Sequence, residues 1–345
     1  MHSCAVMHLT LVLPNLLDAA PAELAAADAP ALARLLSIAP APSLEAGGTI
    51  AIACGRLCVE RQCDWPVAPW LARAAGVEPG GRYWLCAEPA SLEVGRDEVR
   101  LAGVVRDLDA DENAALLSSL RAHFETDGIE FVERGPGNWW ATLALPQQIE
   151  TWPPEAALGQ SLSAYLPRGP DAARWRRWQS EIQMLLFEHP VNRLRESRGR
   201  APVNYVWVWG GGTLHAADPA APRPAVFTHV PWLREFARAA GAEVSKVPRS
   251  LTEFGTASSA SSALIWLDGF EMPGLREQLA AFDADWAAPM ERALARREID
   301  ATLVIAGHAI AISYTLRASG MLQRLRHHWS AAPSLAAQLA AFTDA

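Results

Sequence analysis

The most informative part of this chain is the segment His189–Gly212, which reads HPVNRLRESRGRAPVNYVWVWGGG. Its second half contains a β-branched and aromatic run, Val203–Trp209, which predicts a buried strand that breaks at the three following glycines. Backbone amides in a glycine turn and nearby arginines can together hold an anion at the edge of a sheet. The segment has two interpretations, an anion-binding site and a hinge between two parts of the chain. Taken alone, its residues favour the hinge.

The candidate ligand-binding residues of this segment are His189, Asn192, Arg195, Asn204, Trp209, Gly210 and Gly212. In the hinge interpretation, His189 and Asn192 instead satisfy free backbone groups at the end of the preceding helix. That helix is predicted to run from Asp171 to about Glu188, and Pro190 then ends it.

On both sides of this segment, apolar runs alternate with helical patterns. An apolar run from Met7 to Pro14 predicts the first strand, and apolar residues spaced three or four apart predict a helix at residues 274–297. Further strands are predicted at residues 49–54, 82–87, 203–209, 243–247, 263–268 and 301–306, with helices at residues 31–38, 67–75 and 231–240. This alternation is typical of a mostly parallel sheet that is covered on both faces.

Residues 98–145 have a different character. Strand-like alternation at residues 98–107 precedes an amphipathic helix at 109–127 and a hairpin formed by 129–132 and 139–145. We therefore predict a core domain split into residues 1–90 and 203–345. Residues 91–202 are predicted to form an inserted α+β domain with its connecting helix.

The composition excludes several classes of function. The formal net charge is −8, and Lys246 is the only lysine in the 345 residues. Lys246 lies in neither a P-loop nor a Schiff-base context, and an acidic chain lacks the basic surface that nucleic-acid binding needs. No apolar run approaches the roughly 20 residues of a membrane span, and the first residues lack a basic signal-peptide region. We expect a cytoplasmic protein that binds neither nucleic acid nor membranes.

The five cysteines are unevenly spaced and lie in the first quarter of the chain. Cys54, Cys58 and Cys63 could hold a zinc ion together with one further ligand. Structural zinc sites usually bring their cysteines closer together in pairs, so we interpret these residues as reduced thiols without a metal.

Several spaced proline, glycine and tryptophan positions resemble known families. The segment His189–Gly212, with Trp152–Pro154 and Leu166–Gly169 upstream, resembles the archaeal-type cofactor-independent phosphoglycerate mutases of the alkaline phosphatase superfamily. Tyr83–Pro89 and Glu181–Leu186 resemble the bacterial regulatory protein RpfE family, which is related to these mutases. The resemblance implies an α/β fold with an alkaline-phosphatase-like, doubly wound, mostly parallel sheet and a smaller inserted α+β domain.

The same resemblance implies that most metal ligands of the mutases are missing here. Two metal ions stabilise the attacking and leaving oxygens in phosphoryl transfer. Asn15 stands where the first metal-binding Asp is expected, and Cys63 takes the approximate place of the serine nucleophile. Gly307 precedes the late histidine where the family has Asp. The degenerate catalytic positions are Asn15, Asp18, Cys63, Asp64, Asp268 and His308.

The resemblance therefore implies a pseudoenzyme of the phosphoglycerate mutase group, without catalytic residues, metal or cofactor. We expect a regulatory role in which the chain binds a small anionic metabolite or a protein partner. Two alternatives stay open. One is an active metal-dependent phosphotransferase or mutase that uses Mn or Zn at a residual site, with Cys63 as nucleophile. The other is an interaction protein without any small ligand.

Overall fold

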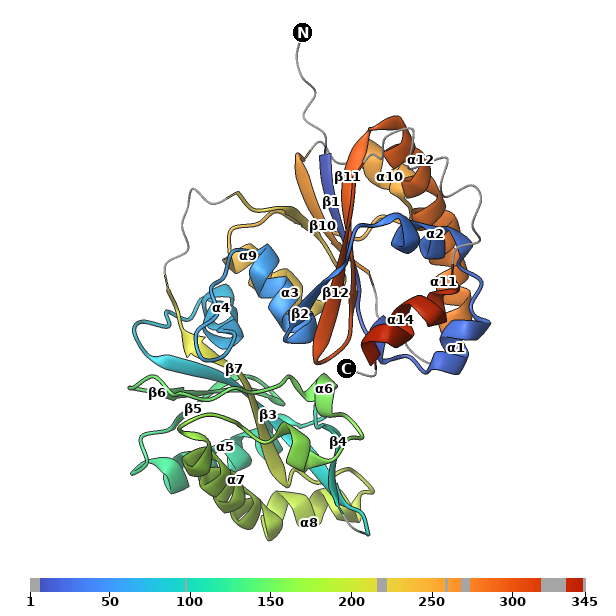
Figure 1. The fold of residues 1–345 in the computed structure, drawn as a ribbon. Helices are drawn as coiled ribbons and strands as arrows, with labels where there is room; N and C mark the ends of the chain where they lie inside the picture. The colour runs from blue at the N-terminus through green and yellow to red at the C-terminus, as the bar shows by residue number, and fades with distance from the viewer. Residues whose placement is uncertain are drawn as a thin grey trace. The chain divides into compact units, whose positions relative to one another are not determined.

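The computed structural model describes residues 7–96, 98–215, 222–257, 260–267, 274–317 and 333–343. The chain divides into two units, shown in Figure 1. We call Met1–Cys58 with Pro219–Ala345 the core unit, and Val59–Asp218 the insert unit. Among the described residues, no helix is both long and apolar enough to cross a bilayer.

The sheet of the core unit is mostly parallel, as the sequence predicts. Within the described residues it has seven strands in the order β2-β12-β11-β1-β10-β8-β9. These strands are β1 (Met7–Leu13), β2 (Ser43–Ala46), β8 (Ala225–Phe227), β9 (Val244–Ser245), β10 (Ser262–Trp266), β11 (Ile299–Ala306) and β12 (Ile310–Leu316). The central strand β1 runs parallel to β10 and β11, whereas β12 is antiparallel to both β11 and β2. The parallel strands therefore bring the ends of β1 and β11 to one edge of the sheet.

Apolar helical faces cover this sheet. The helical segments are η1 (Leu16–Asp18), α1 (Pro21–Ala26), α2 (Pro30–Ile38), α3 (Gly48–Arg56), α9 (Pro231–Ala239), α10 (Leu251–Ala257), α11 (Leu275–Phe282), a π-helical turn (Asp283–Ala287), α12 (Ala288–Arg296) and α14 (Leu335–Thr343). The helix predicted at residues 274–297 is confirmed, and its apolar positions, among them Leu279, Trp286 and Met290, are buried in the main core. The prediction from periodicity holds here because the spacing persists over many turns.

The strand predicted at residues 49–54 is wrong, because this segment forms α3. A short apolar run fits a buried helix as well as a buried strand, so its periodicity does not decide between them. Gly47 and Gly48, with φ angles of 94° and 55°, turn the chain into the helix. A β-carbon on Gly48 would overlap the carbonyl oxygen of His308, so the close approach requires glycine.

The π-helical turn places a carboxylate at the start of another helix. Asp283 Oδ1 accepts the Leu32 amide at 2.7 Å and Oδ2 accepts the Ala31 amide at 3.2 Å. The N-cap residue of α2, Ala29, has no side chain that can accept these amides. Asp283 therefore caps α2 from a distant part of the chain. We expect Asp283→Ala to lower the free energy of unfolding by about 1–2 kcal/mol, the usual cost of a lost N-cap.

Urea unfolding of the two purified proteins measures this difference. The matched control is Asp285→Ala, which changes an exposed carboxylate in the same turn. Equal stability of the two variants would show that the Asp283 carboxylate does not support α2.

The sheet of the insert unit is antiparallel. Its described strands are β3 (Tyr83–Val94), β4 (Val99–Val104), β5 (Glu130–Gly135), β6 (Asn138–Leu143) and β7 (Tyr205–Thr213). Their order is β4-β3-β6-β5, and β7 pairs with β3. The helical segments of this unit are α4 (Val67–Ala74), α5 (Ala110–Phe124), α6 (Pro154–Ala157), η2 (Leu162–Tyr165), α7 (Ala172–Phe187) and α8 (Pro190–Ser197). The predicted helices at 109–127 and 171–188 and the predicted hairpin are confirmed.

The domain boundaries predicted from the sequence need correction. Residues 82–87 and 203–209 were expected in the parallel core sheet, but β3 and β7 pair antiparallel with each other in the insert sheet. The insert unit accordingly spans Val59–Asp218 instead of residues 91–202. The physical reason is that β3 is buried along most of its length, so its apolar run resembles that of a strand in a parallel sheet.

Candidate functional site

His189, the first candidate residue, caps a helix. Its Nδ1 accepts the Val191 amide at 3.3 Å at the start of α8, and its Nε2 lies 3.0 Å from Ser119 Oγ. Burial lowers the pKa of His189, because a charged imidazole is poorly solvated there. The sequence did not predict α8, since Pro190 was read as the end of a helix and not as the first residue of the next.

The side chains of the two candidate asparagines form hydrogen bonds with backbone amides and carbonyls. Asn192 donates from Nδ2 to the carbonyls of Leu186 at 2.8 Å and Val203 at 2.7 Å, and its Oδ1 accepts the Val203 amide at 2.8 Å. Asn204 Oδ1 accepts the Leu92 amide at 2.7 Å, and its Nδ2 donates to the Leu92 carbonyl at 2.9 Å. Asn192 thus ties the end of α7 to the segment before β7, as the hinge interpretation expected of a residue that satisfies backbone groups.

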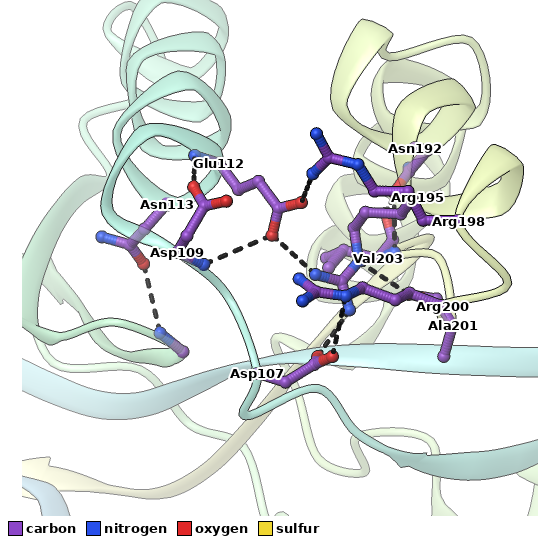
Figure 2. A network of polar contacts seen from close by, with 11 residues as sticks. Asp107, Asp109, Glu112, Asn113, Asn192, Arg195, Arg198, Arg200, Ala201 and Val203 are labelled. Atoms are coloured by element: carbon purple, nitrogen blue, oxygen red, sulfur yellow. Dashed lines mark hydrogen bonds and ion pairs between the residues drawn. The ribbon is translucent and has the colours of Figure 1, made fainter.

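Arg195 is the buried centre of an ionic network that reaches the surface at Asp107 (Figure 2). Its side chain has no exposed surface, and Nη1 donates to Glu112 Oε2 at 2.7 Å while Nη2 donates to Asp107 Oδ1 at 2.5 Å. Nε donates to the Ala201 carbonyl at 2.8 Å. The hydrogen bond from Arg195 lowers the pKa of Asp107. We expected Arg195 to face an external anion, and this expectation is wrong because two carboxylates of the chain already occupy its guanidinium.

Glu112 takes part both in the N-terminal cap of α5 and in the ionic network of Arg195. It lies in the first turn of α5, where it forms a capping box with Asp109: the Asp109 side chain accepts the Glu112 amide at 2.8 Å, and Glu112 Oε2 accepts the Asp109 amide at 3.3 Å. The same Oε2 accepts Arg195 Nη1. The network therefore fixes the start of α5 to α8, and a desolvated arginine is balanced by carboxylates, as buried charges require.

Trp209 and the three glycines do not form an open turn. Trp209 donates from Nε1 to Glu88 Oε1 at 2.9 Å, and the glycines continue β7 as far as Thr213. A β-carbon on Gly211 would overlap Tyr83 Oη, and one on Gly212 would overlap the Pro66 side chain. The glycines permit close packing inside the insert unit, so the predicted glycine break after Trp209 is wrong.

Asp64 is a second buried carboxylate of the insert unit. Its Oδ1 accepts the Trp65 amide at 2.8 Å, and its Oδ2 accepts the Thr151 amide at 3.1 Å, the Gly211 amide at 3.4 Å and the Thr151 hydroxyl. Burial outweighs these donors and raises the pKa of Asp64 to about 7. The adjacent Cys63 is exposed, and desolvation raises the pKa of its thiol, with a further contribution from the Asp64 charge.

The core unit brings two of the predicted positions together. Asn15, with φ of 63°, follows β1, and Asp18 lies in the next turn. Asp18 Oδ2 accepts the His308 amide at 3.0 Å and lies 3.6 Å from His308 Nε2. A side chain at position 307 would overlap Asp18, which explains why glycine precedes His308. Burial raises the pKa of Asp18, although the His308 charge acts in the opposite direction.

A two-metal centre requires several carboxylates and imidazoles with free lone pairs. Among the described residues, no three His, Cys, Asp or Glu side chains are arranged to hold a metal ion. Asp268 lies outside the described residues. Asp18 and His308 could supply two ligands, whereas both oxygens of Asp64 already accept hydrogen bonds. The described donor set therefore does not fit a two-metal centre. The described cysteines Cys54, Cys58, Cys63 and Cys86 form no disulfide bond, and Cys54 is buried.

Sequence reasoning missed the partners of the candidate residues, namely Glu88, Asp107, Glu112 and Thr151. Only Glu112 carried a local signal, because Asp109 followed three residues later by Glu is a capping-box pattern. Nothing in the local sequence connects Thr151 with Asp64, or Glu88 with Trp209.

Part of this chain is similar in sequence to several phosphoglycerate mutases. It is 32% identical over 120 residues to the 2,3-bisphosphoglycerate-independent phosphoglycerate mutase of Methanosarcina mazei, which covers 32% of this chain and 30% of the relative. Over 104 residues it is 38% identical to the mutase of Methanothrix thermoacetophila, covering 28% of this chain and 26% of the relative. Part of this chain is homologous to archaeal phosphoglycerate mutases.

The similarity to these mutases is partial. A longer match, to phosphoglycerate mutase 2 of Methanothermobacter thermautotrophicus, is 27% identical over 186 residues and covers 49% of this chain and 46% of that mutase. The matched segments thus span less than half the length of these mutases. Among solved structures, the cofactor-independent mutase from Thermoplasma acidophilum aligns over 92% of this chain and 91% of its own, with 19% identity and a TM-score of 0.45. No family model matches the chain, and the resemblance to the RpfE family stays a prediction.

Proposed function

We propose that this chain is a catalytically degenerate relative of the phosphoglycerate mutases that has a regulatory role and binds a small anionic metabolite. Phosphoglycerates are the first ligands to test, because they are the substrates named for the homologous enzymes. The observation that supports the loss of catalysis is the hydrogen bonding of Asp64. Its two carboxylate oxygens accept four hydrogen bonds inside the insert unit.

A metal ion would have to replace these hydrogen bonds in order to use Asp64 as a ligand. The donors are three backbone amides and one hydroxyl, and leaving buried donors unpaired costs about 1–3 kcal/mol each. Asn15, whose backbone carbonyl accepts the Asp18 amide at 3.1 Å, offers only a neutral side-chain amide, and a neutral amide is a weaker cation ligand than a carboxylate. These features support a chain that has lost in-line phosphoryl transfer.

The alternative function is a phosphotransferase that uses Cys63 as its nucleophile. Cys63 is exposed, which such a role requires. Its pKa is raised by desolvation and by Asp64, so the thiolate fraction at neutral pH is smaller than that of an ordinary cysteine. Activated cysteines have the opposite shift, which favours the non-catalytic proposal.

We expect the purified protein to show no mutase or phosphatase turnover with 2- or 3-phosphoglycerate when Mn²⁺ or Zn²⁺ is supplied. An archaeal mutase of the homologous group serves as the positive control. The Cys63→Ala variant is measured in parallel, and turnover in the wild type that this variant abolishes would overturn the proposal.

Calorimetry tests the ligand. We expect heat of binding with at least one phosphoglycerate in the wild type, and the His308→Ala variant tests whether the ligand lies at the Asp18–His308 pair. Arg195 is unsuitable as a probe because it is buried inside the insert unit. Absence of heat with both phosphoglycerates would contradict the metabolite-binding part of the proposal.

A further inference from the structure

The strand β5 ends the insert sheet on one side. It pairs antiparallel with β6, and no other described strand pairs with it. The Phe131 carbonyl accepts Arg121 Nε at 2.8 Å, which shows that this carbonyl points away from β6. In an antiparallel strand the N–H and C=O of one residue point the same way, and this direction alternates along the chain. Phe131 and Glu133 therefore present the outward hydrogen-bonding groups of β5.

A groove lies beside the first half of this strand. It has a volume of about 750 Å³, and its walls include Arg121 and Glu125 of α5 and Glu130, Phe131 and Val132 of β5. An unpaired edge with space beside it can accept a further strand, because its backbone groups are already aligned for pairing. The groove therefore leaves room for an added strand beside Glu130–Val132 once the Arg121 side chain moves from the Phe131 carbonyl.

The charges of β5 determine which strand fits. Residues 130–134 read Glu-Phe-Val-Glu-Arg, with opposite charges at the two ends. When two copies pair antiparallel about Val132, Glu130 of one copy lies opposite Arg134 of the other, and the reverse pair forms by symmetry. Opposite charges at directly facing positions stabilise an antiparallel pair. The strand is therefore complementary to itself in this register.

We propose that the edge of β5 is the interface between two copies of this chain, which add their β5 strands antiparallel about a twofold axis at Val132. The backbone geometry agrees with this register. The outward groups of Phe131 and Glu133 face each other across the axis and form hydrogen-bonded pairs, while the two Val132 residues form the close, non-hydrogen-bonded pair between them. An interface of this kind uses the same surface on both copies.

The charged side chains lie on the required face. Val132 pairs with Trp140, and the guanidinium of Arg134 lies 5.6 Å from the centre of the Trp140 ring, so Arg134 shares the face of Val132 although a bulge follows Glu133. Glu130 pairs with Thr142, which lies two residues after Trp140 on β6, and Glu130 reaches Arg82 at 3.0 Å. Glu130 and Arg134 therefore lie on one face of the sheet, as the proposed cross-strand pairs need.

Arg121 is the side chain that regulates access to the edge. Its hydrogen bond to Phe131 covers an outward carbonyl in the single chain, and natural proteins protect sheet edges with charged residues in this manner. We expect Arg121→Ala to increase the dimer fraction at a given concentration, because the backbone group is then free to pair.

Charge reversal tests the interface. A single strand pair buries a small area, so association is expected to depend on concentration, and sedimentation velocity over a dilution series of the full chain measures it. Glu130→Arg and Arg134→Glu each place like charges opposite one another and should reduce dimerisation at least tenfold. The double variant Glu130→Arg/Arg134→Glu restores the opposite pairs and should recover most of the wild-type affinity.

The matched control is Glu196→Arg, an exposed charge reversal on α8 that should leave association unchanged. Circular dichroism of each variant separates loss of pairing from loss of folding, and the double variant shows the pairing directly. A wild-type chain that stays monomeric at every concentration would overturn the proposal. So would a dimer whose affinity is indifferent to both single reversals.

Discussion

Replacement of Arg195 by methionine is expected to lower the free energy of unfolding of the insert unit by about 3–5 kcal/mol. The substitution keeps an apolar stem of similar length but removes the cation between Glu112 and Asp107. Glu112 is only 4% exposed, so its carboxylate is left in a poorly solvated position with the half-exposed Arg198, at 4.0 Å, as its remaining cationic neighbour. Hydrogen exchange of the α5 and α8 amides measures the loss, because both helices are held by this residue.

Two variants separate the buried network from ordinary surface charge. Arg198 lies 4.0 Å from Glu112 and is about half exposed, so Arg198→Met should cost at most about 0.5 kcal/mol. The double variant Arg195→Met/Glu112→Gln should recover part of the loss, since a neutral amide tolerates burial and can still accept the Asp109 amide. Equal effects of Arg195→Met and Arg198→Met would contradict the assignment.

Asp64→Asn is expected to have the second large effect, a loss of about 2–3 kcal/mol in the free energy of unfolding. Both carboxylate oxygens face donors, and asparagine replaces one of them with an NH₂ group that cannot accept. If the NH₂ group takes the place of Oδ1, the Trp65 amide loses its acceptor, and if it takes the place of Oδ2, the Thr151 and Gly211 donors lose theirs. Urea unfolding followed by tryptophan fluorescence measures the change, because Trp207 and Trp209 are buried in β7.

The same variant should change the pH dependence of stability. Folding raises the pKa of Asp64 from 3.8 to about 7, so the folded state binds a proton that the unfolded state has released between these values. The stabilisation from this proton is complete below the ordinary pKa and is lost as the pH rises through about 7. From pH 5 to 7 the wild type should therefore lose up to about 1.4 kcal/mol per pH unit relative to Asp64→Asn.

The control for this experiment is Glu196→Gln, which neutralises an exposed carboxyl group in the same unit. Its difference from the wild type, measured over the same pH range, is the reference for removing one carboxyl group from this unit. A pH-independent difference between the wild type and Asp64→Asn would show that burial does not raise the pKa of Asp64.

The local sequence predicts the strands but not the sheet to which each strand belongs. Residues 263–268 and 301–306 were assigned to the core sheet and contribute β10 and β11 there. Residues 82–87 and 203–209 have the same apolar character, yet β3 and β7 belong to the insert sheet. A strand that is buried on both faces has an apolar run whichever helices or strands cover it. The run therefore does not indicate which sheet the strand joins.

The candidate site shows the same limit at the level of side chains. The segment 189–212 predicts an anion-binding site, but the contacts of Asn192, Arg195 and Trp209 all lie within the insert unit. A buried arginine beside a glycine-rich strand has the same sequence pattern whether its anion is a ligand or a carboxylate of the chain. Only the position of Glu112 and Asp107 decides between the two.

The sequence by itself determined the helices with sustained apolar spacing, the hairpin of β5 and β6, and the exclusion of lysine-dependent chemistry, because each depends on residues that are neighbours in the chain. The tertiary structure decided which sheet β3 and β7 join and what Arg195 binds. Arg195 meets Glu112 and Asp107 across sequence separations of 83 and 88 residues. Contacts over such distances arise from the packing of the whole unit, and no local pattern of residue types encodes them.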